Sequence, residues 1–134
     1  MRSFFIALCV LQKTLRVDFW GQSNQVGAGG SSGQAPIPDG NHCKKYQINT
    51  QTLVAHVEPS GSNFGSFQSG SGLQSAFVKK LYELTNRDII CFKTAMGGTS
   101  ASQWSTTLST ESLDYLAAAP SNIKDANIEP ILVY

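Results

Sequence analysis

Short apolar runs alternate with polar, glycine-rich stretches along this chain. Residues 15–20 are rich in strand-forming side chains and end at a glycine, which predicts a β-strand. Two shorter alternating runs, residues 45–48 and 53–57, are separated by four polar residues and predict a small hairpin. Loops rich in glycine and serine, residues 27–40 and 59–70, flank that hairpin.

The apolar spacing changes to a helical period after residue 70. Four apolar positions then fall on one face of a predicted helix: Leu73, Phe77, Leu81 and Leu84. Residues 88–93 are apolar on both faces, which is typical of a central parallel strand. A second helix is predicted after Thr110 with Leu113, Leu116 and Ala117 directed inward, and Pro120 either breaks or restarts it. Residues 130–134 predict another strand.

This alternation of strands and helices is the order of a parallel α/β sheet. Functional loops of such sheets follow the carboxyl ends of the strands, and the polar turns after Trp20 and Ala95 occupy such ends. The predicted helices are few for a sheet that needs cover on both faces. We therefore expect one apolar face to remain open and the protein to be poorly soluble.

The amino-acid composition argues against two classes of binding partner. The 134 residues are 41% hydrophobic and 14% charged, with a formal net charge of +1, which indicates a folded domain. The lysine pairs Lys44-Lys45 and Lys79-Lys80 are isolated, so neither nucleic acid nor an anionic membrane is an expected partner.

The three cysteines indicate neither a zinc cluster nor a disulfide framework, because no two of them have CxxC spacing. Cys91 lies in an apolar run and is expected to be a core residue. A bridge between Cys9 and Cys43 stays open at this point.

The first 14 residues form an apolar segment ahead of a predicted domain at residues 15–134. Arg2 followed by apolar residues 4–11 is typical of a secretion signal and gives a slight preference for a secreted protein. The segment lacks a clear cleavage site, so a buried first strand and a misassigned start codon are the alternatives. The apolar run is too short to span a bilayer.

The run Gly21-Gln22-Ser23-Asn24 is the strongest candidate for chemistry, because it places a serine at a strand-to-loop turn. Gly21 permits a tight turn, and the following backbone N–H groups can face a developing oxyanion. The alternative is an ordinary Ser/Asn turn. The nucleophile elbow of α/β-hydrolases is excluded because Gln25 replaces its second glycine, and the glycines after Gln25 fit no phosphate-loop spacing.

Three motifs in order resemble the sialate O-acetylesterase and acetylxylan esterase branch of the SGNH-type hydrolases. They are Gly21-Gln22-Ser23-Asn24, then Gly72 with Phe77 five residues on, then Ala95-x-Gly97-Gly98-Thr99-Ser100 with Trp104 four residues later. The resemblance implies a three-layer, flavodoxin-like SGNH hydrolase fold with a central parallel sheet. It also implies that the domain is truncated at the C-terminus.

The resemblance assigns roles to residues of this sequence. Ser23 is the implied nucleophile, and its own N–H and that of Gly72 are the implied oxyanion donors, although Gly70 competes with Gly72. Further cleft residues are implied at Gln22, Asn24, Gly97, Gly98 and Thr99, and substrate-binding residues at Ser100 and Trp104. No metal and no cofactor is implied. The expected activity is removal of O-acetyl groups from a sialate- or xylan-like carbohydrate through an acyl-enzyme.

The sequence departs from the family pattern where the general base is expected. Gln25 stands where the family commonly has Met, which removes no catalytic atom. The family's Trp-x-Gln-Gly-Glu block and its later Asp-x-x-His are both missing, and neither His42 nor His56 matches the position of the base. We therefore expect this chain alone to be inactive. The alternative function is a non-catalytic carbohydrate-binding remnant or an inactive gene fragment.

Overall fold

The computed structural model describes residues 14–21, 38–48, 50–57, 73–124 and 129–133. Five strands form one sheet in the order β3-β2-β4-β1-β5. The strands are β1 (Leu15–Gly21), β2 (Cys43–Gln47), β3 (Thr52–Ala55), β4 (Ile89–Ala95) and β5 (Glu129–Val133). The helices are α2 (Gln74–Thr85), α3 (Ala101–Trp104), α4 (Thr107–Ala117) and α5 (Ser121–Lys124).

The sheet is mostly parallel, as the strand order along the chain predicts. Strand β4 lies at its centre, and β1 lies between β4 and β5 and pairs in parallel with both, so that Val17 is opposite both Cys91 and Ile131. Strand β2 also runs parallel to β4, and β3 alone is antiparallel, paired with β2 as the predicted hairpin. The carboxyl ends of β1 and β4 therefore meet at one edge of the sheet, called here the carboxyl edge. The starts of β2 and β4 meet at the opposite, amino edge.

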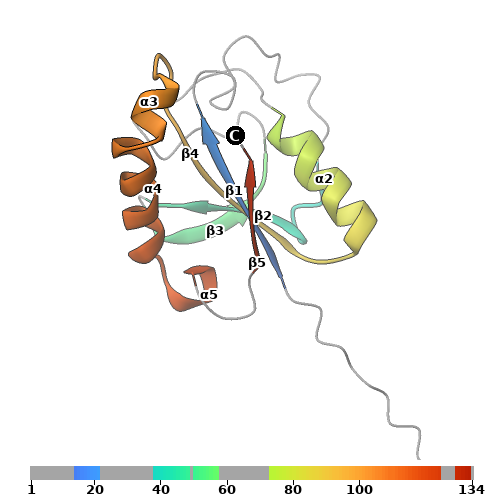
Figure 1. Ribbon diagram of the computed structural model, residues 1–134. Coiled ribbons are helices and arrows are strands. Elements are labelled where there is room, and N and C mark those ends of the chain that lie inside the picture. The colour runs from blue at the N-terminus through green and yellow to red at the C-terminus, as the bar shows by residue number, and fades with distance from the viewer. Residues whose placement is uncertain (1–13, 22–37, 49, 58–72, 125–128, 134) are drawn as a thin grey trace, which may run out of the picture.

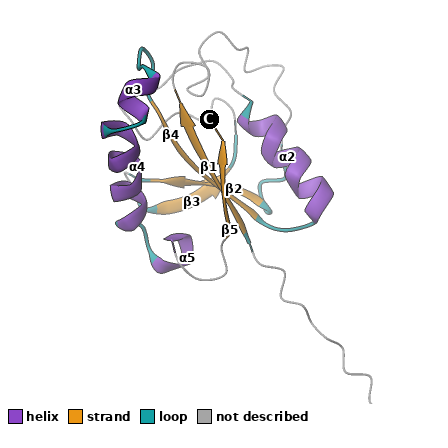
Figure 2. Ribbon diagram, in the orientation of Figure 1, coloured by secondary structure: helices purple, strands orange, loops and turns teal. Residues whose placement is uncertain are grey.

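Helices cover both faces of the sheet, so the expectation of an open apolar face is wrong for the described residues. Helix α2 lies on one face, and α3, α4 and α5 lie on the other (Figure 1). Figure 2 shows the same three layers by element type. One core cluster lies on the α2 side: Leu15, Val17, Phe19, Cys43, Val78, Ile89 and Cys91. The other lies on the α4–α5 side: Tyr46, Ile90, Phe92, Ala119 and Ile123.

The short helix α5 adds to the cover that α4 gives to its face of the sheet (Figure 1). Residues after Pro120 restart a helix, and Ile123 in this helix is only 1% exposed. Ala119, just before that proline, is also buried in the same cluster. Four residues are too few for a hydrophobic period to be visible in the sequence.

The buried faces of the two longer helices match the predicted ones in part. Phe77 and Leu81 of α2 and Leu116 of α4 are partly buried and pack against the core, as predicted. In α2 the fully buried residues are Gln74, Ser75 and Val78, while Leu84 is 72% exposed. Helix α4 begins at Thr107 rather than after Thr110, and Leu113, predicted to point inward, is 52% exposed. None of the helices described is long and apolar enough to cross a membrane.

Helix α4 turns a polar side chain inward because that side chain has a partner on the sheet. The buried hydroxyl groups of Ser112 and Thr94 lie 2.5 Å apart in hydrogen-bond contact. A hydrogen bond removes most of the cost of burying two hydroxyls, so the helix face is set by this pair as well as by apolar side chains. A hydrophobicity pattern alone does not contain that information.

The two described cysteines are buried free thiols. Cys91 is a core residue on β4, as predicted. Cys43 is also in the core, with its thiol 3.8 Å from the carbonyl oxygen of Val78, so it takes no part in a bridge to Cys9. Cys9 itself lies outside the described residues, as does the whole of the apolar segment at residues 1–13.

Candidate functional site at the carboxyl edge

The carboxyl edge brings together the ends of the two strands that precede the polar motifs. Strand β1 ends at Gly21 and β4 ends at Ala95, which are opposite each other in the parallel register. One further hydrogen bond, from the N–H of Met96 to the oxygen of Gly21 at 3.0 Å, joins the two chains just beyond the last pair. Gly21 has a φ of 152°, which L-residues with a side chain rarely adopt. The chain therefore leaves β1 with a backbone conformation at Gly21 that favours glycine.

The turn after β4 is built around a threonine hydroxyl. The side chain of Thr99 donates a hydrogen bond to the carbonyl oxygen of Met96 at 2.7 Å, closing the turn from within. Gly98 has a φ of 76°, in the left-handed region that favours glycine. Around Gly97, no atom of the described residues lies within 4 Å of the position that a Cβ would take. The turn is thus tightly held at Thr99 and open above Gly97.

Helix α3 begins directly after this turn with a capping box. The N–H of Gln103 donates to Ser100 Oγ at 3.3 Å, and the N–H of Ser100 donates to Gln103 Oε1 at 2.8 Å. These reciprocal bonds satisfy backbone donors that the helix leaves without partners. The spacing Ser-x-x-Gln is itself a sequence signal for the start of a helix. The box fixes the first turn of α3 and thereby the position of Trp104.

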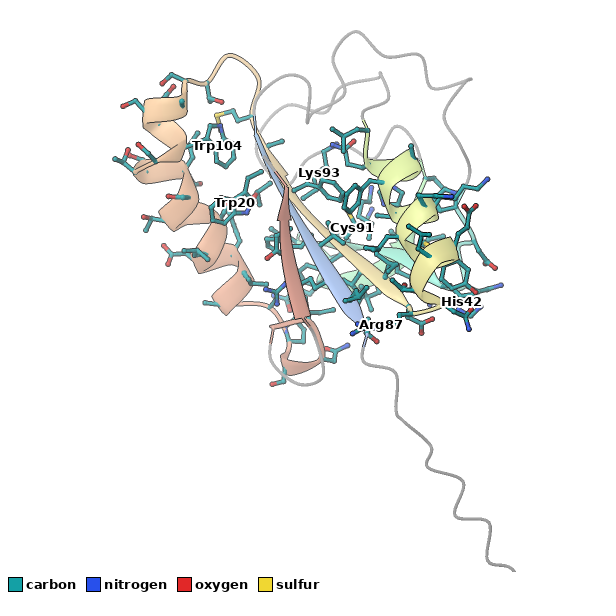
Figure 3. The ribbon with its side chains drawn as sticks, turned by 45° about the vertical axis from the view of Figure 1, so that its right-hand side comes forward. Trp20, His42, Arg87, Cys91, Lys93 and Trp104 are labelled. Atoms are coloured by element: carbon teal, nitrogen blue, oxygen red, sulfur yellow. The ribbon has the colours of Figure 1, made fainter. Side chains whose placement is uncertain are left out.

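Two indole rings lie side by side at this edge, one from β1 and one from α3. The rings of Trp20 and Trp104 are stacked, with centroids 6.4 Å apart and an interplanar angle of 25° (Figure 3). The indole N–H of Trp104 donates to Thr99 Oγ1 at 2.8 Å. Both rings are half-buried. Trp20 was not predicted as a site residue, although its place as the aromatic residue just before the Gly21 motif was an available signal.

The structure describes five of the site residues implied by the sequence, and it brings them to this one edge. They are Gly97, Gly98, Thr99, Ser100 and Trp104. Four others, Gln22, Ser23, Asn24 and Gly72, lie outside the described residues. Their roles stay predictions, supported by the positions of the described residues next to them in the chain.

Both histidines of the sequence lie at the other end of the sheet. His42 precedes β2, and its carbonyl oxygen accepts the N–H of Ile89, the first residue of β4, at 2.8 Å. The N–H of His56 donates to the carbonyl oxygen of Cys43 at 2.9 Å, and its side chain is 1% exposed. The seven residues of β4 place the amino and carboxyl edges about 20 Å apart. Figure 3 shows His42 far from Trp20 and Trp104.

His42 has local partners that account for its position. Its Nδ1 lies 2.8 Å from Asp88 Oδ1, and its ring stacks on Tyr82 of α2 with centroids 4.8 Å apart. These contacts join β2, β4 and α2 at the amino edge. Within the ranges that the structure describes, no group of three or more His, Cys, Asp or Glu side chains could hold a metal ion.

Three charged side chains of β1 and β4 are buried within the sheet: Arg16, Asp18 and Lys93. On β1, Arg16 Nε donates to Asp18 Oδ1 at 2.8 Å, and a second guanidinium nitrogen donates to the oxygen of Ile123 at 3.1 Å. Burial raises the pKa of Asp18, and the guanidinium of Arg16 opposes this rise. On β4, Lys93 is 1% exposed. These groups belong to the interior of the domain rather than to an open site.

No family model and no curated protein sequence matches this chain. Its fold is similar to a crystal structure of a protein from Arabidopsis thaliana, with a TM-score of 0.69 and 14% sequence identity. The match covers 90% of this chain and 56% of that protein, so this chain spans little more than half of its length. The likeness agrees with a mixed α/β fold of flavodoxin-like kind, built on a mostly parallel sheet.

Proposed function

We propose that this chain forms the nucleophile-bearing part of a serine esterase that removes O-acetyl groups from carbohydrate. The observation that carries the proposal is the hydrogen bond from Met96 N–H to the oxygen of Gly21. It joins the two strand ends from which the Gln22-Ser23-Asn24 and Gly97-Gly98-Thr99 segments continue. Ser23 is two residues beyond Gly21, so its Cα lies within about 7 Å of the Cα of Gly21.

The placement of α2 supports a second element of the proposed site. This 12-residue helix ends four residues before β4 starts at the amino edge, so its first turn is at the carboxyl edge. The N-terminal end of a helix carries partial positive charge, which stabilises a nearby anion. Gly72 is two residues before the first helical residue, Gln74, and its Cα lies within about 7 Å of the Cα of Gln74. A backbone N–H there is suited to an oxyanion.

In the proposed mechanism, Ser23 Oγ attacks the acetyl carbonyl carbon and a bond forms between them. The carbonyl oxygen becomes an oxyanion that accepts hydrogen bonds from the N–H groups of Ser23 and Gly72. The sugar oxygen leaves with a proton, and the acetyl group stays on Ser23 as an ester. Water then attacks this ester and releases acetate, which regenerates the serine.

The general base of this mechanism is neither of the two histidines in the sequence. His42 and His56 both lie at the amino edge, about 20 Å from the carboxyl end of β4. In this proposal, a group other than these two histidines accepts the proton of Ser23. We also propose that the domain has the three-layer SGNH-type fold, and the mostly parallel sheet with helices on both faces (Figure 1) supports this proposal.

The test uses the product of the complete gene. A fluorophosphonate probe is expected to label Ser23, and Ser23→Ala is expected to abolish acetate release from an acetylated oligosaccharide. Ser32→Ala, in the same glycine- and serine-rich segment, is the matched control and should keep full activity. Full activity of Ser23→Ala would exclude Ser23 as the nucleophile.

A second candidate function is carbohydrate binding without catalysis. The observation that favours it is the contrast between the two edges, because the stacked indoles are at the carboxyl edge and both histidines are at the amino edge. A complete gene product that binds oligosaccharide but neither reacts with the probe nor releases acetate would support this alternative.

A further inference from the structure

Strand β3 has a neighbouring strand on one side only, because it is the first strand in the sheet order β3-β2-β4-β1-β5. The N–H of His56 donates to the carbonyl oxygen of Cys43 at 2.9 Å, which fixes which residues of this segment face β2. Peptide groups alternate in direction along an antiparallel strand. Those of Leu53 and Ala55, an odd number of positions before His56, therefore point away from β2.

The outward peptide groups of Leu53 and Ala55 are open to pairing with another strand. Among the described residues, no backbone or side-chain group hydrogen-bonds to them on that side. The side chain of Ala55 is exposed, and those of Leu53 and Val54 are half-buried. The N–H and C=O groups of this side of β3 therefore form a short template for a further strand.

Strand β3 also lacks the features that usually keep an open strand from pairing. Natural proteins protect such strands with charged side chains, with proline or with a bulge. Residues 50–57 contain no Asp, Glu, Lys, Arg or Pro. The register between β2 and β3 runs without a bulge from the pair Lys44–Ala55 to the pair Gln47–Thr52. Nothing in this segment opposes the addition of a strand.

We propose that the outer side of β3 is a self-association surface, on which a second copy of this chain adds its own β3 in antiparallel orientation. With the two-fold axis at Val54, Leu53 of each copy lies opposite Ala55 of the other. Each such pair exchanges both of its N–H···O bonds, so the outward groups of both residues all find partners. The two sheets then form one continuous sheet. The proposal does not depend on the esterase function.

Packing and charge both favour a second copy as the occupant. Val54 meets its own equivalent across the axis, and β-branched side chains suit cross-strand contact. The charged neighbour on β2 is Lys45, which is opposite Val54. Three strand spacings separate the Lys45 positions of the two copies, about 14 Å, which exceeds the Debye length of about 8 Å at physiological salt. The two copies therefore bring no like charges together on these strands.

The association is measured directly by sedimentation velocity of the full 134-residue chain. A contact made by one short strand from each copy is small, so we expect a weak, reversible dimer that forms between about 10 μM and about 1 mM. The sedimentation coefficient should rise with concentration and level off at the value of a dimer.

Val54→Glu is the variant that separates pairing from folding. In the single chain the new carboxylate faces Lys45 on β2, and a cross-strand pair of opposite charges supports the fold. In the dimer the two carboxylates face each other across the axis, and we expect dimerisation to weaken about tenfold or more. Leu84→Glu, at an exposed position on α2, adds the same charge elsewhere and should dimerise as the parent does.

A cysteine cross-link tests the register and is a second readout if Val54→Glu does not fold. Across the axis the two Val54 Cα atoms are expected about 4.5 Å apart, which a disulfide spans. Val54→Cys should therefore form a covalent dimer under mild oxidation faster than the parent, whose own cysteines set the background. In Thr52→Cys the two new thiols are about 13 Å apart along the strands, so this variant should stay at the background rate.

Three results would overturn the proposal. The first is a chain that sediments as a monomer throughout the concentration range. The second is a folded Val54→Glu variant that dimerises as tightly as Leu84→Glu, which would place the contact elsewhere on the molecule. The third is cross-linking of Thr52→Cys as fast as that of Val54→Cys, which would exclude the antiparallel register about Val54.

Discussion

Replacement of His42 by alanine tests the separation of the two edges. In the structure, His42 contacts two neighbouring segments at the amino edge. It hydrogen-bonds with Asp88, just before β4, and stacks on Tyr82 of α2. A role as catalytic base requires instead that its ring reach Ser23 beyond the other end of β1. The two roles predict different effects of the same substitution on stability and on activity.

The expected loss of stability follows from the two contacts. The side chains of His42 and Asp88 are 43% and 61% exposed, so their contact is worth about 0.2–1 kcal/mol. The stacking of the His42 ring on Tyr82, with an interplanar angle of 13°, adds about 0.5–1.5 kcal/mol. We therefore expect His42→Ala to lower the free energy of unfolding by about 1–2 kcal/mol in urea titrations. A double-mutant cycle with Asp88→Ala should return a coupling within the range of the first contact.

Activity provides the decisive comparison. Loss of a general base typically slows a reaction about 10²–10⁴-fold. In the complete gene product, acetate release by folded His42→Ala should instead match the parent. If the variant stays folded and loses activity on the scale of a missing base, then His42 reaches Ser23 and the assignment of the two edges is wrong. A stability identical to that of the parent would show that the contacts with Asp88 and Tyr82 do not form in solution.

Three further predictions concern stability. Burial, with a smaller effect of two nearby carboxylates, raises the pKa of the Cys43 thiol from its ordinary 9.0 to about 11. Because the unfolded chain then loses its proton first, stability should fall as the pH rises from 9 towards 11, and urea titrations of Cys43→Ala should lack that fall. Gly98→Ala should lower the free energy of unfolding by about 1–2 kcal/mol because φ is positive at this position, whereas Gly97→Ala should lower it little. Equal losses in the two variants would contradict the described turn. Thr94→Val should lower the free energy of unfolding by about 1–3 kcal/mol, because it leaves the buried Ser112 hydroxyl without its hydrogen-bond partner. Adding Ser112→Ala should recover part of this loss in thermal unfolding, and strictly additive losses would refute the Thr94–Ser112 hydrogen bond.

Strands were easier to predict from this sequence than helix faces. The runs at residues 15–20 and 88–93 correspond to β1 and β4, with shifts of one or two residues at their ends. Strands buried on both sides leave a continuous apolar run that does not depend on which face meets which helix. The parallel arrangement followed from the alternation of elements and is confirmed by the pairing of β1 with β4 and β5.

Helix faces were harder because polar pairs decide them. Leu84 and Leu113 fit an apolar helical spacing and yet face solvent, while Gln74, Ser75 and Ser112 are buried. The Thr94–Ser112 contact shows why for one of these, since the two partners are 18 positions apart in the chain. The hydropathy pattern of one helix cannot show a hydrogen-bond partner that lies on a separate strand.

The candidate site was likewise predictable from the sequence only in part. The prediction that the Gly97–Ser100 turn follows a strand at the carboxyl edge needed only the order of the elements, and it holds. The stack of Trp20 on Trp104 depends on a contact between β1 and α3, 84 positions apart, and was not predictable from either segment alone. What could have been noticed was the spacing Ser100-x-x-Gln103, which signals the helix that carries Trp104.

The contrast between the two edges also bears on how the proposed chemistry could work. At the amino edge, the hydrogen-bond contact between His42 and Asp88 and the stacking of His42 on Tyr82 involve side chains that are well exposed to water. At the carboxyl edge, the turn and helix start are held by neutral hydrogen bonds from Thr99 and Ser100. Oriented N–H dipoles stabilise a developing oxyanion in proportion to the charge that develops on it. In the proposed acyl transfer, N–H groups of this kind would act on the oxyanion, while the base that accepts the proton of Ser23 changes its own charge.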